Sequence, residues 1–348
     1  MRPLVLKGHT KPIKDIQFNN ENDLLFTAST DRLITLWSSE YGERIGTYQH
    51  LAAIYTMSIT KDSKYLLSGD SNGCTYIWEA STGELLKSIS STSRNFPSIS
   101  SVQFSDGDKK ILVSESERGS SSHSRINIYN FDDIMKASTI NENKNIKITP
   151  ELTITAPDNN KISKAKWINN NENILSTTES GFLFLFDAIN GNKIKNKKIH
   201  DSEIMDLDIS KYEEIVLTAS KDGKAHVINP DTFDIVQTFF PQNPTRNINS
   251  CKISPLMSLE DDDERKFHAF IAGGQESRDV TTSHANKGGF ELLIYDLLFG
   301  KELGAIQGHF GPVNTLAISS DGYLLATGSE EASVRINKLN TDEYKALS

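Results

Sequence analysis

This chain of 348 residues repeatedly places a polar turn residue six positions before the end of a short apolar run. The pairs of turn residue and run end are Asp31 with Trp37, Asn72 with Trp78, Ser180 with Phe186, and Asp222 with Ile228. The first two run ends lie 41 residues apart, and the last two lie 42 residues apart. A unit of this size cannot bury its apolar face alone, so we expect the copies to pack against one another.

Three further run ends, Tyr129, Tyr295 and Asn337, extend the series to seven units. In the first unit, apolar and β-branched residues mark strands at 13–18, 24–29, 33–37 and 44–48, separated by polar or glycine-containing turns. A period of about 40–45 residues with several short strands per unit is typical of a WD40 β-propeller. We therefore predict an all-β fold, a seven-bladed WD40 propeller in which residues 1–348 form a single domain with a short C-terminal tail at 340–348.

The two ends of the chain are expected to meet. The seventh unit offers strands at 313–318, 323–327 and 334–339 but no fourth strand, whereas residues 3–7 form an extra apolar run before the first unit. Pairing residues 3–7 with the last blade would close the ring and remove an open sheet edge.

Charge and cysteine usage narrow the function. A net charge of −9 argues against a primary nucleic-acid binder, because such binding depends on neutralising phosphates. No apolar run approaches the roughly 20 residues of a membrane helix. Cys74 and Cys251, the only cysteines, lie four units apart without metal-ligand spacing. We expect a cytoplasmic protein that binds no metal, cofactor or membrane and forms no homo-oligomer.

His9, Ser29, Asp31 and Trp37 have the residue types of a catalytic Ser-His-Asp set with an aromatic neighbour. We interpret them as a structural network, in which the imidazole bridges the turn carboxylate and the strand hydroxyl and the indole N–H completes the bonds. The matching residues of other units are His50, Ser68, Trp78, His309 and Ser329. A nucleophile does not need several copies, so we expect no catalytic residue and no enzymatic activity.

Long steps between run ends locate insertions. Residues 132–150 are expected to form a solvated loop between strands, 259–264 an acidic surface loop, and 275–289 a long polar connection. Loops of this length are commonly functional or disordered. The lysines at 193, 195, 197 and 198 are expected on an outer strand of the fourth blade, where they protect a sheet edge. Contact with RNA is the less favoured alternative.

Three acidic residues of the fifth unit have two interpretations. Asp222 matches the turn aspartate Asp31 by spacing, and Asp206 and Asp208 share one face of a strand because they lie two residues apart. If that face is exposed, Asp206, Asp208 and Asp222 form an acidic dock for a basic peptide. Ordinary surface charge is the alternative.

Three stretches go beyond the generic repeat. They are the segments 8–48 with Gly-His and Gly-Glu-Arg-Ile-Gly-Thr-Tyr, 273–291 with Gly-Gly-Gln-Glu and Asp-Val-Thr-Thr, and 306–315 with Gly-His-Phe-Gly-Pro-Val-Asn. With these segments the chain resembles the family of subunit i of eukaryotic translation initiation factor three, over essentially its whole length.

The resemblance implies a seven-bladed scaffold without enzymatic activity, which helps to assemble the initiation factor on the small ribosomal subunit. It implies binding to the C-terminal segment of subunit b across the fifth and sixth blades, and contact with subunit g. A different WD-repeat adaptor, such as a receptor-kinase-associated or RNA-assembly scaffold, is the alternative. An enzyme that uses the propeller channel is a third hypothesis.

Overall fold

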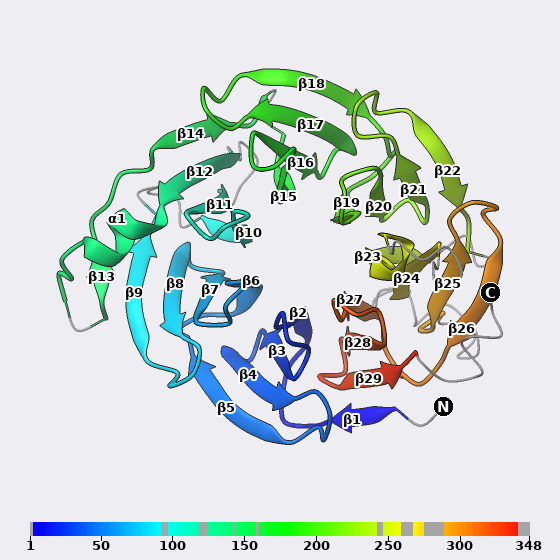
Figure 1. Ribbon diagram of the computed structural model, residues 1–348, viewed down its shortest axis with the longest axis horizontal. Coiled ribbons are helices and arrows are strands. Elements are labelled where there is room, and N and C mark those ends of the chain that lie inside the picture. Colours follow the sequence, from blue (N-terminus) through cyan, green and yellow to red (C-terminus); the bar gives the residue numbers. More distant parts are fainter. Residues whose placement is uncertain are drawn as a thin grey trace.

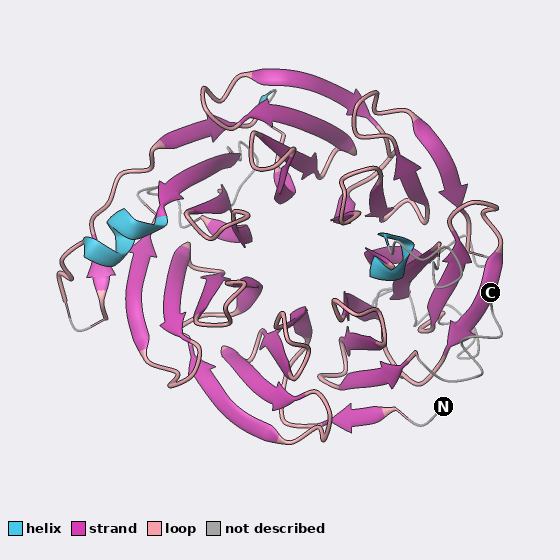
Figure 2. Cartoon of the chain, viewed as in Figure 1, coloured by secondary structure: helices cyan, strands magenta, loops and turns pink. Residues whose placement is uncertain are grey.

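Seven sheets stand side by side around a central axis (Figure 1). The computed structural model describes residues 3–91, 97–117, 124–141, 143–157, 160–241, 246–258, 267–274 and 289–339. Strands form nearly all of the ring (Figure 2), and α1 (Phe131–Lys136) is the one α-helix among these residues. The predicted all-β, seven-bladed propeller is confirmed.

Each blade contributes one strand to each of four concentric positions. The innermost strands are β2 (Ile13–Phe18), β6 (Ile54–Ile59), β10 (Ser98–Phe104), β15 (Ile162–Ile168), β19 (Ile204–Ile209), β23 (Asn247–Ile253) and β27 (Val313–Ile318). The second strands are β3 (Leu24–Ser29), β7 (Tyr65–Asp70), β11 (Lys110–Ser116), β16 (Asn173–Thr178), β20 (Val216–Ser220), β24 (His268–Gly274) and β28 (Leu324–Ser329).

The third strands are β4 (Leu33–Ser38), β8 (Cys74–Glu79), β12 (Ser124–Asn130), β17 (Phe182–Asp187), β21 (Ala225–Ile228), β25 (Leu292–Asp296) and β29 (Val334–Lys338). The outer strands are β5 (Arg44–Gln49), β9 (Leu85–Ser90), β14 (Leu152–Thr155), β18 (Lys193–Lys198), β22 (Ile235–Phe239), β26 (Glu302–Ile306) and β1 (Leu4–Leu6). A 3-10 turn, η2 (Pro255–Ser258), follows β23.

Burial follows this order of positions. The second strands are buried nearly throughout, since neighbouring blades cover both of their faces, and β20 and β24 have no exposed residue. The outer strand β18 is exposed at five of its six residues. The apolar cores lie between adjacent blades, as where Tyr48 of blade one packs near Trp78 of blade two.

The seven run ends of the sequence repeat occupy one structural position. Trp37 pairs with Leu25, Trp78 with Leu66 and Ile228 with Val216, each joining the third strand to the second. The other four run ends make the matching pairs Tyr129–Ile111, Phe186–Ile174, Tyr295–Ala269 and Asn337–Leu325. The period in the sequence is therefore the period of the blades.

The N-terminal strand closes the ring as expected. β1 pairs antiparallel with β29, with Leu4 opposite Ile336 and Leu6 opposite Val334, and it becomes the outer strand of blade seven. Leu6 is 3% exposed and packs in the core shared by blades seven and one.

The insertion at 132–150 is not the solvated loop that we expected. It contains most of α1 and a short strand, β13 (Asn145–Ile146), which adds in parallel to β9 of the neighbouring blade. Phe131, Ile134 and Ile146 are buried between blades two and three, which explains the difference: the insertion carries apolar residues that find a core. The expected loops at 259–264 and 275–288 and the tail at 340–348 lie outside the described residues.

Candidate functional site

The predicted histidine network of blade one is present, with a different hydroxyl. His9 Nδ1 lies 2.9 Å from Asp31 Oδ2 and His9 Nε2 lies 2.8 Å from Thr27 Oγ1. Trp37 Nε1 donates to the same Thr27 oxygen at 2.9 Å, and the backbone N–H of Thr10 donates to Asp31 Oδ2. The four side chains connect the loop before β2 to the second and third strands of the blade.

Two other blades contain the same bonds. The sets are His200, Asp222 and Thr218 in blade five, and His309, Glu331 and Thr327 in blade seven. Blade two keeps His50, Ser68 and Trp78, with Ser68 Oγ 3.1 Å from the imidazole and 2.9 Å from the indole nitrogen. Burial lowers the pKa of His50 to about 3, so this imidazole stays neutral.

Ser29 and Ser329 do not bridge histidine and carboxylate, which corrects the sequence prediction. Ser29 Oγ donates to Lys11 O and accepts from the backbone N–H of Asp31, while Ser329 Oγ accepts from Glu331 N. The bridging residue lies eighteen positions after the histidine in every case (Thr27, Ser68, Thr218, Thr327). That constant spacing was visible in the sequence and would have identified threonine.

These groups resemble a catalytic triad in residue type, but their hydroxyl groups are not accessible to a substrate. The side chains of Thr27 and Ser68 are fully buried, and an indole N–H occupies each hydroxyl oxygen. Burial raises the pKa of Asp31, but hydrogen bonds from His9 and backbone N–H groups outweigh it and lower the pKa. A substrate could not reach the hydroxyl without unfolding the blade, so the arrangement can only stabilise the turn.

Asp222 is the turn carboxylate of blade five, and its side chain is 8% exposed. Burial raises its pKa, whereas the hydrogen bond and charge of His200, with the N–H groups of Asp201 and Lys224, lower it to about 2. The carboxylate is therefore ionised and bonded within its own blade.

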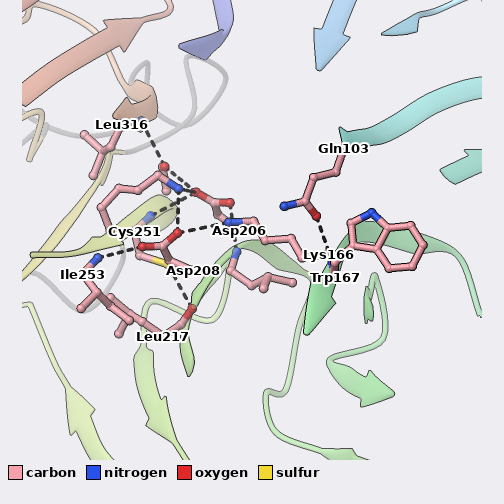
Figure 3. A network of polar contacts seen from close by, with 12 residues as sticks. Gln103, Lys166, Trp167, Asp206, Asp208, Leu217, Cys251, Ile253 and Leu316 are labelled. Atoms are coloured by element: carbon pink, nitrogen blue, oxygen red, sulfur yellow. Dashed lines mark hydrogen bonds and ion pairs between the residues drawn. The ribbon is translucent and has the colours of Figure 1, made fainter. Parts of the chain in front are cut away.

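Asp206 and Asp208 share a face of β19, as predicted, but that face lines the central channel (Figure 3). Asp208 Oδ1 lies 3.1 Å from Lys166 Nζ of blade four and 3.3 Å from Lys252 Nζ of blade six. Asp206 Oδ2 accepts from Ser250 Oγ at 2.6 Å and from the backbone N–H of Cys251. The two side chains are 13% and 15% exposed, so the exposed acidic face that a docking site requires is not present.

Opposite charges balance in this part of the channel. Burial lowers the pKa of Lys252, but Asp208 and Asp206 outweigh it and raise the pKa. For Asp206 and Asp208, burial raises the pKa and Lys252 and Lys166 lower it below the usual value. In Asp15 the cost of burial prevails and the pKa is raised, although Lys164 and the N–H of Met57 oppose the shift.

Hydrogen bonds and an ion pair from side chains of the innermost strands join each blade to the next, all the way around the ring. Each of seven junctions has a side chain that bonds to the next blade: Asp15 to Met57 N, Thr56 to Val102 N, Gln103 to Trp167 N, Lys166 to Asp208, Asp208 to Ile253 N, Ser250 to Leu316 N, and Asn314 to Ile13 O. The ring surrounds a channel cavity of about 1070 Å³. Sequence reasoning missed it because the partners lie 42 or more residues apart.

The basic strand β18 is on the outside of blade four, as predicted. Lys197 forms an ion pair with Asp234 and Lys195 Nζ donates to Asp231 O, both in the turn of the next blade. Contacts to the neighbouring blade therefore engage two of the four lysines.

No group of three or more His, Cys, Asp or Glu side chains in the described part of the chain is arranged to hold a metal ion. Cys74 and Cys251 are free thiols, and no described helix is long and apolar enough to cross a bilayer.

Comparison with known proteins covers the chain from end to end. The family model EIF3I matches residues 1–347. The chain is 33% identical to eukaryotic translation initiation factor 3 subunit I of Kluyveromyces lactis, over 99% of this chain and 94% of that protein. It is 32% identical to the protein of the same name from Schizosaccharomyces pombe, over 97% of this chain and 96% of that protein. It is also 32% identical to the protein of that name from Dictyostelium discoideum, over 99% of this chain and 96% of that protein.

The match spans all seven blades, and its extent agrees with the resemblance carried by the segments near residues 8, 273 and 306. The chain belongs to the family of eukaryotic translation initiation factor 3 subunit I.

Proposed function

We propose that this chain is a non-catalytic scaffold subunit of the translation initiation factor three complex. It is located in the cytoplasm, where it holds the C-terminal segment of subunit b, contacts subunit g, and supports assembly on the small ribosomal subunit. The observation that carries the proposal is the match of the whole propeller to relatives named as this subunit. The groups that resemble a catalytic triad are buried and hydrogen-bonded to one another, which agrees with a scaffold.

Subunit b docks across the fifth and sixth blades in this proposal. Asp206 and Asp208 contribute indirectly, because they bond blade five to Lys252 and to backbone N–H groups of blade six. Asp222 likewise fixes the loop that begins at His200. These three carboxylates keep the two blades in register, while other residues make the direct contact.

An apolar surface on the outside of the same two blades supports this location. Val236 on β22 is 65% exposed, and Leu298 and Phe299, in the turn between β25 and β26, are 60% and 81% exposed. Gly300 of that turn lies against the side chain of Gln237, so the turn of blade six touches the outer strand of blade five. Exposed large apolar residues that cluster are typical of protein interfaces. Leu298 and Phe299 stand in a turn where polar residues are usual, so the sequence itself carries a signal of this surface.

Affinity isolation of the tagged chain from a lysate of its own organism, followed by mass spectrometry, tests the assignment. Subunits b and g are expected at comparable amounts under low salt. Recovery of an unrelated assembly without initiation-factor subunits would favour a different WD-repeat adaptor.

Substitution of the apolar surface tests the docking site. Leu298→Ala and Phe299→Ala are expected to weaken binding of a subunit b C-terminal fragment at least fivefold, since buried apolar anchors dominate such interfaces. Ile189→Ala is the matched control: Ile189 is 84% exposed, and its N–H bonds to Asp187 as that of Leu298 bonds to Asp296. Equal binding by all three variants, measured by calorimetry, would contradict this location.

A further inference from the structure

The histidine networks display one residue each on a single face of the ring. In blades one, five and seven the carboxylate that binds the histidine also accepts from the next backbone N–H, at Thr10, Asp201 and Phe310. In blade two the same position is Leu51, which follows His50. In three of these residues the backbone N–H is therefore bonded to a carboxylate that a histidine also holds, so their side chains project from a fixed backbone.

These residues share one face because of how the strands connect. Each lies in the connection from an outer strand to the innermost strand of the next blade. The turns between second and third strands lie on the same face of the ring as these connections. Arg32, in such a turn, accepts at its carbonyl from the N–H of His50. The turns that carry Phe299 and Ile189 join third to outer strands and therefore lie on the opposite face.

Blades seven and two, which flank blade one around the ring (Figure 1), each place an apolar residue on this face. Phe310 is 85% exposed and Leu51 is 70% exposed. An aromatic side chain has few rotatable bonds to restrict when a partner covers it, and the backbone of Phe310 is already fixed, so Phe310 is suited to act as an anchor. We call the surface formed by Phe310, Leu51 and the cations Lys7, Lys11 and Arg32 the anchor face.

Uncompensated positive charge lies between the two anchors. Lys7, Lys11 and Arg32 are exposed, and no ion pair between described residues includes them. The carboxylates nearby all have partners: Asp31 is bonded to His9, Glu331 to His309 and Ser333, and Glu330 to Lys14 and Asn314. Asp31 is almost fully buried and Glu331 is 24% exposed, so the three exposed cations outnumber the exposed carboxylates, although the chain as a whole has a net charge of −9.

We propose that the anchor face binds an extended acidic segment of a partner protein, with an apolar residue at each end of its acidic run. The apolar residues cover Phe310 and Leu51, and the carboxylates face Lys7, Lys11 and Arg32. A short acidic peptide fits better than RNA, since a long polyanion would be repelled by the negative chain as a whole and Leu51 provides no ring for base stacking. The anchor face is separate from the fifth and sixth blades, so this proposal goes beyond the function proposed above.

Selection from a random twelve-residue peptide library on the purified full chain tests the proposal without presupposing a partner. The expected peptides carry several Asp or Glu residues between apolar residues. Enrichment of neutral or basic peptides, or no enrichment over the immobilising resin, would overturn it.

Variants then locate the binding of the most enriched peptide, measured by fluorescence polarisation. Phe310→Ala and Leu51→Ala are expected to raise Kd at least fivefold, and Lys11→Glu with Arg32→Glu at least tenfold with a smaller salt dependence. Tyr41→Ala is the matched control, because Tyr41 is an aromatic residue, 67% exposed, in the turn between β4 and β5 on the opposite face of the ring. Kd should change less than twofold in this variant.

Two competing occupants give distinct results. Displacement of the peptide by a single-stranded oligouridylate at equal concentration, or dimerisation of the free chain that Phe310→Ala abolishes in sedimentation, would each overturn the proposal. Subunit b binding is measured with Leu298→Ala, so failure of either proposal leaves the other standing.

Discussion

At the scale of single residues, the Thr27 hydroxyl completes the network of blade one. Two bonds depend on it: its oxygen accepts from Trp37 Nε1 and lies 2.8 Å from His9 Nε2. In Thr27→Val the side chain keeps its shape, but two buried nitrogens lose their partner, and the free energy of unfolding should fall by about 3 kcal/mol. Ser29→Ala removes peripheral bonds and should cost about 1 kcal/mol. Urea denaturation of both variants measures the difference. Equal losses in the free energy of unfolding would contradict the conclusion that Thr27, rather than Ser29, completes the network.

A second residue-scale prediction concerns pH. His226 stacks on His200 with ring centroids 4.2 Å apart, and burial, followed by the nearby His200, lowers its pKa to about 4. In the unfolded chain a histidine has a pKa near 6.5, so as pH falls the unfolded state takes up the proton first. This contribution to stability is present above pH ~6.5 and is lost between ~6.5 and ~4.

His226→Tyr tests the pH dependence, because Tyr76 occupies the matching register position in blade two. The Tm of the variant should decline less than that of the native chain between pH 7 and pH 4.5. Parallel Tm profiles would show that His226 does not titrate between the two states.

At the scale of elements, β1 is a latch of three residues. Its side chains alternate, with Leu6 in the core between blades seven and one and Val5 42% exposed. Leu6→Ala should lower the free energy of unfolding by about 2–4 kcal/mol, since it leaves a cavity beside Gly42 and Val334. Val5→Ala, on the same strand, should cost less than about 0.5 kcal/mol. Similar losses in thermal denaturation would mean that the strand does not pack as described.

At the scale of the whole molecule, the ring of bonds around the channel couples each blade to the next. Asp208→Ala would leave Lys252 largely buried with a weaker partner, and should cost about 3–5 kcal/mol. Lys252→Met in the same chain should restore much of this loss, because the uncompensated charge is then gone. Lys197→Ala, which breaks the exposed pair with Asp234, is the control and should cost under about 1 kcal/mol. A double-mutant cycle measures the coupling, and additive losses would contradict the shared network.

Much of the fold could be predicted because its signal is periodic. The run ends from Trp37 to Asn337 recur since each blade must bury the same position of its third strand. The latch at 4–6 could be predicted because the last unit lacks a strand. The strand β13 could not, since its pairing with β9 depends on a contact across 55 or more residues.

The candidate site was predicted less well. The histidines and the tryptophans were placed correctly in their network, but Ser29 was chosen over Thr27 because a triad suggests serine. Asp206 and Asp208 were put on one face, which strand geometry requires, yet the sequence held no sign of Lys166 and Lys252 opposite them. Their role in partner binding stays a prediction.

The order of residues alone determined the number of blades, the period and the family, because these features depend on local patterns repeated along the chain. Only the tertiary structure decided which charges remain available to a partner. Whether a charged side chain finds a partner depends on groups brought close from other blades. Asp208 on β19 is bonded within the ring, whereas Arg32, in the turn between β3 and β4, faces solvent. Distance in space, rather than position in the chain, sets the energy between charges.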